Sequence, residues 1–140
     1  MKSTFFKYTI IFVSLFSMFF ATSCELDDDE PNGLEDARTK FNGSWMCTEQ
    51  SQLSYPVTIT NNPQNSSEVY INNFNLFGKD EYVVAKIAGF SMSIPDQKAC
   101  STYDVSGNGQ MSSNKKDIVL QYTVKDGANT ETINANYTKQ

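Results

Sequence analysis

The sequence predicts an all-β fold of about eight antiparallel strands, closed into an up-and-down barrel. Apolar and polar residues alternate with a period of two along most of the chain beyond residue 40, as in strands with one buried face. Gly, Pro and Asn recur at short spacing, so short turns join consecutive strands and make them antiparallel. Closure of eight strands removes exposed sheet edges, and a two-sheet sandwich is the alternative.

The first half of this region contains four predicted strands. Its composition, rich in Thr, Ser, Asn, Tyr and Val, favours strands over helices. The strands and their inward residues are 43–51 with Trp45 and Cys47, 55–61 with Val57 and Ile59, 68–74 with Val69 and Ile71, and 81–88 with Val83, Ala85 and Ile87. Residues 62–67 form a loop between the second and third strands, and Phe77 and Gly78 turn the chain before the fourth.

The second half contains four more strands, with corners at Gly89 and at Asp126-Gly127. They are 90–95 with Phe90, Met92 and Ile94, 99–107 continuing through a bulge at Gly109, 117–124 with Ile118, Leu120, Tyr122 and Val124, and 130–138 with Ile133, Ala135 and Tyr137. The large residues predicted to line or fill the barrel are Trp45, Phe90, Met92, Tyr122 and Tyr137.

The start of the chain has the features of an export signal. Two lysines precede an apolar stretch at 8–21, which is shorter than the roughly 20 residues that cross a bilayer and is typical of a signal peptide. Three small residues then precede Cys24, and this pattern resembles the lipobox of bacterial lipoproteins. The resemblance implies that 1–23 are removed and that acyl chains on Cys24 anchor the protein to a membrane. An ordinary signal peptide with an incidental cysteine is the alternative.

The acidic charge is confined to the segment after Cys24. Residues 25–36 contain seven acids and no bases, whereas 37–140 contain nine of each. Acids in this position resemble the export signal of surface lipoproteins in the Bacteroidetes, and they also suit a solvated tether. We therefore expect a lipidated, flexible tether at 24–40, a barrel domain at 41–140 and a location on the outer membrane, exposed at the cell surface. The neutral domain has no basic stripe for nucleic acid.

The barrel region also resembles a known family. The segments that carry the resemblance are FNGSWMCTEQ (41–50), YPVTITNNPQNSSEVYINNF (55–74), SMSIPDQ (91–97), VSGNGQMSSN (105–114) and IVLQYTVKDGANTETINANYTK (118–139). Together they are similar to the small lipocalin-like, calycin-type lipoproteins of gut Bacteroidetes. The Gly-x-Trp at Gly43 to Trp45 resembles the first-strand signature of lipocalins, which implies that Trp45 plugs the closed end of the barrel. Members of this group are mostly without an assigned activity.

The residue types argue against most catalytic classes. The chain has no histidine, which removes the usual base of Ser and Cys hydrolases and the commonest nitrogen ligand of zinc. We expect no cofactor and no metal. Carboxylate pairs can hydrolyse glycosidic bonds without histidine. The candidates, however, lie mainly at predicted turns, where acids serve as turn formers; they are Asp80, Glu81, Asp96, Asp104 and Asp126.

Two further cysteines, Cys47 and Cys100, are the only free thiols once Cys24 carries lipid. We predict a disulfide between them, because an oxidising envelope favours one and closing a loop of about 50 residues would stabilise the fold by a few kcal/mol. Two buried thiols that pack as small apolar groups are the alternative.

Aromatic residues at strand ends, loops and outward positions are the last candidates for a site. A flat ring there could stack on a sugar or contact a protein, although scattered surface rings are also normal. They are Tyr55, Tyr70, Phe74, Phe77, Tyr82 and Tyr103. The leading hypothesis is a non-catalytic accessory lipoprotein that binds a small apolar ligand, a glycan or a protein partner; the alternative is a carboxylate-based enzyme acting on a glycan or lipid.

Overall fold

The computed structural model describes residues 35–140. The predicted signal peptide, Cys24 and the acidic run at 25–30 lie outside the described residues. The compact unit begins at Glu35, so residues 35–40, expected in the tether, belong to the barrel unit instead. Within residues 35–140, no helix has the length and apolar character needed to cross a membrane.

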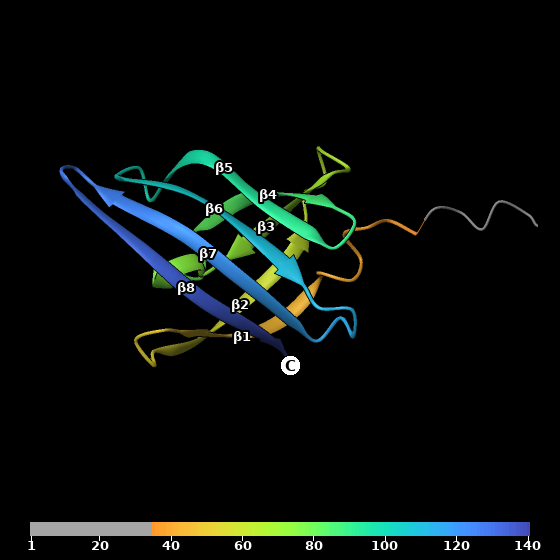
Figure 1. The fold of residues 1–140 in the computed structure, drawn as a ribbon. Coiled ribbons are helices and arrows are strands. Elements are labelled where there is room, and N and C mark those ends of the chain that lie inside the picture. Colours follow the sequence, from red (N-terminus) through yellow and green to blue (C-terminus); the bar gives the residue numbers. More distant parts are fainter. Residues whose placement is uncertain (1–34) are drawn as a thin grey trace, which may run out of the picture. The chain divides into compact units, whose positions relative to one another are not determined.

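Eight antiparallel strands form one closed barrel, which confirms the predicted all-β fold (Figure 1). Each strand pairs with the next, and the last pairs with the first. The elements are β1 (Gly43–Glu49), β2 (Ser54–Asn61), β3 (Glu68–Asn72), the short 3-10 helix η1 (Phe74–Leu76), β4 (Tyr82–Ala88), β5 (Ser91–Ala99), β6 (Tyr103–Met111), β7 (Asp117–Asp126) and β8 (Asn129–Lys139).

Large side chains fill the inside of the barrel. Burial alternates along each strand, as on β7, where every second residue from Ile118 to Val124 is buried. The largest fully buried side chains are Trp45, Tyr122, Tyr137, Phe41 and Phe74. Of the five residues predicted to line or fill the barrel, four lie in this core, namely Trp45, Met92, Tyr122 and Tyr137.

Phe90 does not line the interior as predicted. Gly89 adopts a positive φ of 59° and Phe90 follows it in the turn, so β5 begins only at Ser91. The Phe90 ring is half-buried against the edge of the core, with Nζ of Lys40 4.1 Å from its centroid. The alternation of buried and exposed residues in β5 therefore starts at Met92, two residues later than predicted.

The bulge predicted in the sixth strand lies in β5 instead. The register of β5 on β6 shifts between Ile94 and Gln97, at a proline that has no N–H for the sheet. The Gln97 side chain compensates, because its amide bonds both the N–H and the carbonyl of Val84 on β4, at 2.8 and 2.7 Å. β6 runs unbroken past Gly109, where a Cβ would come within 2.9 Å of Leu120 Cδ1. Gly109 therefore makes room for the core.

The connections between strands lie at two opposite ends of the barrel (Figure 1). The closed end is formed by the segment 35–42 and by the turns at 62–67, 89–90 and 112–116. The loop end carries the connections 50–53, 73–81, 100–102 and 127–128, and its hairpin tips lie at the left of Figure 1. The last of these is a two-residue turn at Gly127 and Ala128, since Asp126 pairs with Asn129.

Candidate functional site

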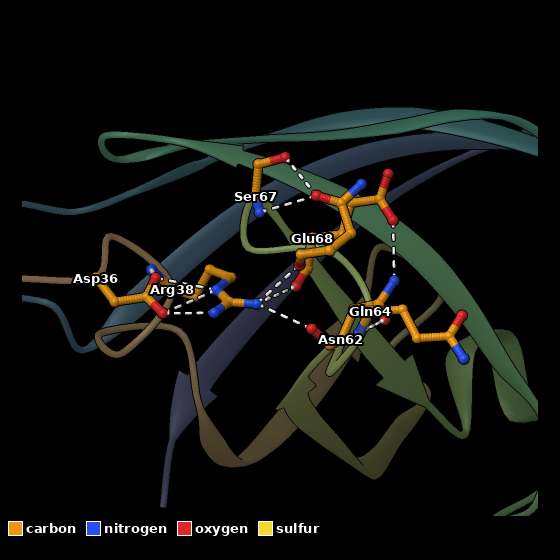
Figure 2. A network of polar contacts seen from close by, with 7 residues as sticks. Asp36, Arg38, Asn62, Gln64, Ser67 and Glu68 are labelled. Carbon is orange, nitrogen blue, oxygen red and sulfur yellow. Dashed lines mark hydrogen bonds and ion pairs between the residues drawn. The ribbon is translucent and has the colours of Figure 1, made fainter.

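Polar groups at the closed end bond to one another (Figure 2). The Arg38 guanidinium pairs with the Asp36 carboxylate at 2.6 Å and donates to the carbonyl oxygens of Asn62 and Asn65 at 3.0 and 2.8 Å. These bonds to Arg38 lower the pKa of Asp36 and raise that of the guanidinium. The segment before β1 is thereby fastened to the β2–β3 turn.

Trp45 closes the same end from inside. Its Nε1 donates to the carbonyl oxygen of Phe41 at 2.8 Å, and both side chains are fully buried. Nζ of Lys139 lies 5.1 Å from the Trp45 ring centroid and donates to the Lys40 carbonyl oxygen at 2.9 Å. Trp45 thus lies where the lipocalin resemblance implied. The Trp45 and Lys139 donors have protein partners, whereas Oδ1 of Asn42 is buried without one.

The loop end has a buried cluster of hydroxyl groups under its mouth. Tyr55 donates to Oε1 of Glu49 at 2.6 Å. Oη of Tyr122 lies 3.2 Å from the same oxygen and 3.0 Å from Oδ1 of Asn75, so its single proton serves one of two acceptors. Burial raises the pKa of both tyrosines, which keeps their hydroxyls protonated. Tyr55, predicted among accessible aromatics, is instead buried.

Cys47 lies deeper in the barrel, and the predicted disulfide does not form. Cys47 faces the interior from β1, whereas Cys100 is in the β5–β6 turn, and both thiols are free. Strand β1 pairs with β2 and β8, so closure of the barrel keeps Cys47 apart from strands β5 and β6 and from the turn between them that carries Cys100. Burial raises the pKa of Cys47 to about 11, which keeps the thiol neutral and unreactive.

A strained turn covers the mouth of the barrel. Asn73, Asn75 and Leu76 have φ angles of 59°, 50° and 57°, in the left-handed region that a leucine rarely adopts. Phe74 points inward and is fully buried, with its ring centroid 4.5 Å from that of Tyr122. Phe74 is therefore a plug rather than an accessible aromatic, while Leu76 stays 49% exposed.

Beside this turn lies a hollow of about 510 Å³, which we call the loop-end groove. It runs between the η1 turn and the β7–β8 hairpin. Phe77 and Tyr103 line it with rings stacked at 4.9 Å and 20°, both half-buried. Its other lining residues include four exposed polar ones, Asp126, Asn129, Thr130 and Glu131.

Those four polar side chains have unused hydrogen-bonding capacity. No side-chain hydrogen bond or ion pair joins any of them to another part of residues 35–140. They offer carboxylate acceptors, an amide and a hydroxyl next to a flat aromatic pair. A few polar groups beside apolar surface are the usual composition of a small-ligand site.

The carboxylates considered for the enzymatic alternative are spread over several elements. Asp126 and Glu131 share the groove, but both are exposed to solvent. Asp104 forms an exposed ion pair with Lys98 at 2.7 Å. Within the described part of the chain, no three His, Cys, Asp or Glu residues are grouped so that they could hold a metal ion.

Comparison with known proteins gives similarity of fold only. No protein-family model matches the chain, and no curated protein matches it either. One similar solved structure is that of EF1p2_mFAP2b bound to DFHBI, with 15% identity, a TM-score of 0.49, and coverage of 75% of this chain and 98% of that one. Another is a redesigned beta barrel, b11L5F_LGL, with 12% identity, a TM-score of 0.48, and coverage of 75% and 96%. At these values neither similarity bears on function.

The sequence predicted part of this site. Phe77 and Tyr103 come together in the groove, whereas Tyr70 and Tyr82 pack on each other elsewhere, with centroids 4.4 Å apart. Glu49 was missed, although the period of two that places Trp45 and Cys47 inward also places Glu49 inward. The polar residues of the β7–β8 hairpin carried no signal beyond that of an ordinary turn.

Proposed function

We propose that this chain is a non-catalytic accessory lipoprotein, acylated on Cys24 at the outer membrane, that binds a ligand in the loop-end groove. The contrast between the barrel ends carries this proposal. Arg38, Trp45 and Lys139 of the closed end donate to backbone carbonyl oxygens, whereas the side chains of the four polar groove residues make no hydrogen bond or ion pair within residues 35–140. A surface that keeps free polar groups beside stacked aromatics is suited to a second molecule.

The described residues begin at Glu35, at the closed end of the barrel, and the proposed anchor lies before them in the sequence. The support for acylation itself is the sequence pattern around Cys24.

The lining indicates the kind of ligand. A small apolar molecule inside the barrel would have to displace Phe74 and other fully buried side chains. In the groove, Asp126 and Glu131 disfavour an anion. The stacked pair of Phe77 and Tyr103 suits a ligand with a flat apolar face, and the free acceptors suit one that carries hydroxyl or amine donors.

A thermal-shift screen tests this function. The mature protein is heated with lauric acid, haemin, or neutral trisaccharides, since a ligand that binds only the native state raises the melting temperature. We expect a shift with a donor-rich probe, lost in Tyr103→Ala and kept in Tyr82→Ala, a matched change at an exposed tyrosine outside the groove. No shift with any class contradicts small-ligand binding, as does a shift that Tyr103→Ala leaves intact.

Two further measurements test the remaining parts of the proposal. Cys24→Ser should move the protein from the membrane fraction to the soluble one, whereas Cys100→Ser should not. A wild-type protein found in the soluble fraction would contradict the anchor.

The non-catalytic role is tested by chromatography of glycans and lipid esters incubated with the protein, which should show no products. Turnover that is lost in Asp126→Asn or Glu131→Gln would contradict the non-catalytic role and support the carboxylate enzyme.

A further inference from the structure

A second hollow, of about 350 Å³, lies on the outer surface of the barrel over β5 to β8. We call it the outer hollow. Asp96 is the single charged residue that lines the hollow. Six outward residues with hydroxyl or amide side chains also line it: Ser93, Ser106, Asn108, Gln121, Thr123 and Thr132. The donors and acceptors of this surface are thus nearly all uncharged.

Two local features of the strands lie at this hollow. The bulge between Ile94 and Gln97 bends β5, and bulges re-aim the side chains next to them. Gly107 on β6 has no side chain, and a Cβ there would lie 2.6 Å from Cβ of Tyr122, so the strands approach closely at this point. Because Gln97 bonds the backbone of Val84, the bend leaves that part of β4 paired.

The polar surface beside the outer hollow is held in a fixed arrangement. Gln121 donates to Oδ1 of Asn134 at 2.8 Å, and Asn134 donates to Oε1 of Gln50 at 2.8 Å, which makes a row of amides from β7 across β8 to the β1–β2 connection. The hydroxyls of Ser106 and Thr123 lie 3.1 Å apart. Such bonds hold exposed polar groups in position before a ligand arrives, which lowers the entropy lost on binding.

The outer hollow adjoins the loop-end groove along β8. Thr130 lines the groove and Thr132 lines the outer hollow. Alternate residues of a strand face the same side and lie roughly 7 Å apart, at about 3.4 Å of rise per residue. Both threonines are exposed, so a ligand longer than one hollow can contact both.

We propose that the loop-end groove and the outer hollow form one extended site for an uncharged oligosaccharide of several sugar units. This inference rests on the proposed function and specifies its ligand. A sugar ring offers an apolar face for Phe77 and Tyr103 and hydroxyl groups for the side chains of both hollows. A nucleic acid lacks basic partners here, and a lipid chain lacks a continuous apolar surface.

Calorimetric titration with unbranched neutral gluco-, manno- and xylo-oligosaccharides of two to six units tests this site. We expect affinity for one series to rise by about tenfold or more with length, which is the effect of roughly one good additional hydrogen bond. Thr132→Lys should abolish the gain with length while leaving disaccharide affinity unchanged. Thr138→Lys, the same change on the same face of β8 outside both hollows, should have no effect.

Each outcome separates the two proposals. If short and long oligosaccharides bind equally, or if Thr132→Lys keeps the gain with length, the extended site is wrong and the groove alone binds the ligand. If no oligosaccharide binds while lauric acid or haemin gives a shift that Tyr103→Ala abolishes, the sugar assignment is wrong and the proposed function stands. If no probe binds, both are wrong.

Discussion

Three polar side chains at the closed end of the barrel and four in the loop-end groove differ in their bonding. At the closed end, Arg38, Trp45 and Lys139 each donate to a backbone carbonyl oxygen and tie the segment before β1 to the strands. At the loop end, a buried tyrosine pair around Glu49 lies beside the groove, whose four exposed polar side chains make no hydrogen bond or ion pair within residues 35–140. The closed end therefore contributes to stability, and the loop end keeps groups available for another molecule.

Backbone conformation shows the same contrast. Seven non-glycine residues between 35 and 140 have positive φ, and six of them lie in the connections of the loop end. They are Gln52, Asn73, Asn75, Leu76, Cys100 and Ser101. Such strain is costly and is found where function holds a loop in an otherwise unfavourable conformation. Strain and unused polar groups thus coincide at one end.

The largest effect is expected at the closed end, from Trp45→Ala. Removal of this fully buried ring should lower the free energy of unfolding by about 3–5 kcal/mol, and it leaves the carbonyl of Phe41 without its donor. Urea denaturation measures the loss. Val119→Ala, at a residue 65% exposed on β7, should change stability by less than about 0.5 kcal/mol. A Trp45 variant as stable as that control would show that the plug is dispensable.

At the loop end, a smaller change of opposite sign is expected. Leu76→Gly removes a side chain from a left-handed position and should raise the free energy of unfolding by about 1 kcal/mol. Leu53→Gly is the matched control, because Leu53 is similarly exposed in the same end of the barrel but does not have a positive φ. Gly there should be destabilising by about 0.5–1 kcal/mol. Equal effects of both changes, measured in urea, would contradict strain at Leu76.

The smallest effect is a pH dependence of the closed end. The folded pKa of Asp36 lies below its ordinary value of 3.8, so its bond to Arg38 stabilises the fold fully above that value and the effect is lost as pH falls through the folded pKa. Asp36→Asn should be less stable than wild type at pH 7, with the difference shrinking below about pH 4. A pH-independent difference in thermal unfolding would contradict this assignment.

Much of the fold follows from the sequence because period two fixes which face of each strand is buried. It correctly placed the alternating core of β7 from Ile118 to Val124. The prediction from the period of two was wrong where a local feature of the backbone interrupts the alternation. Phe90 shares the face of Met92 in pattern but lies in a turn, and the bulge follows the missing N–H of Pro95 rather than Gly109.

The site is less predictable because it depends on closure of the barrel. Phe74 and Phe77 are close in sequence, yet one plugs the interior and the other lines the groove, and only the left-handed residues around them decide this. The groove itself joins the η1 turn to the β7–β8 hairpin, which are far apart in the chain. A disulfide between Cys47 and Cys100 was predicted from an oxidising envelope and from the stabilising effect of closing a long loop, without knowledge of which strands are neighbours; both thiols are free.

The most direct test of the functional contrast is to map ligand contacts by backbone amide NMR. The mature protein is titrated with unbranched neutral hexasaccharides, and shifts are followed at both barrel ends. We predict changes at residues 75–77, 103 and 124–132 around the groove and at 93–96, 106–108 and 121–123 in the outer hollow, and none at 36–42 or 62–67. Shifts centred on the closed end would contradict a ligand site at the loop end, and the absence of shifts at every residue would contradict an oligosaccharide as its ligand.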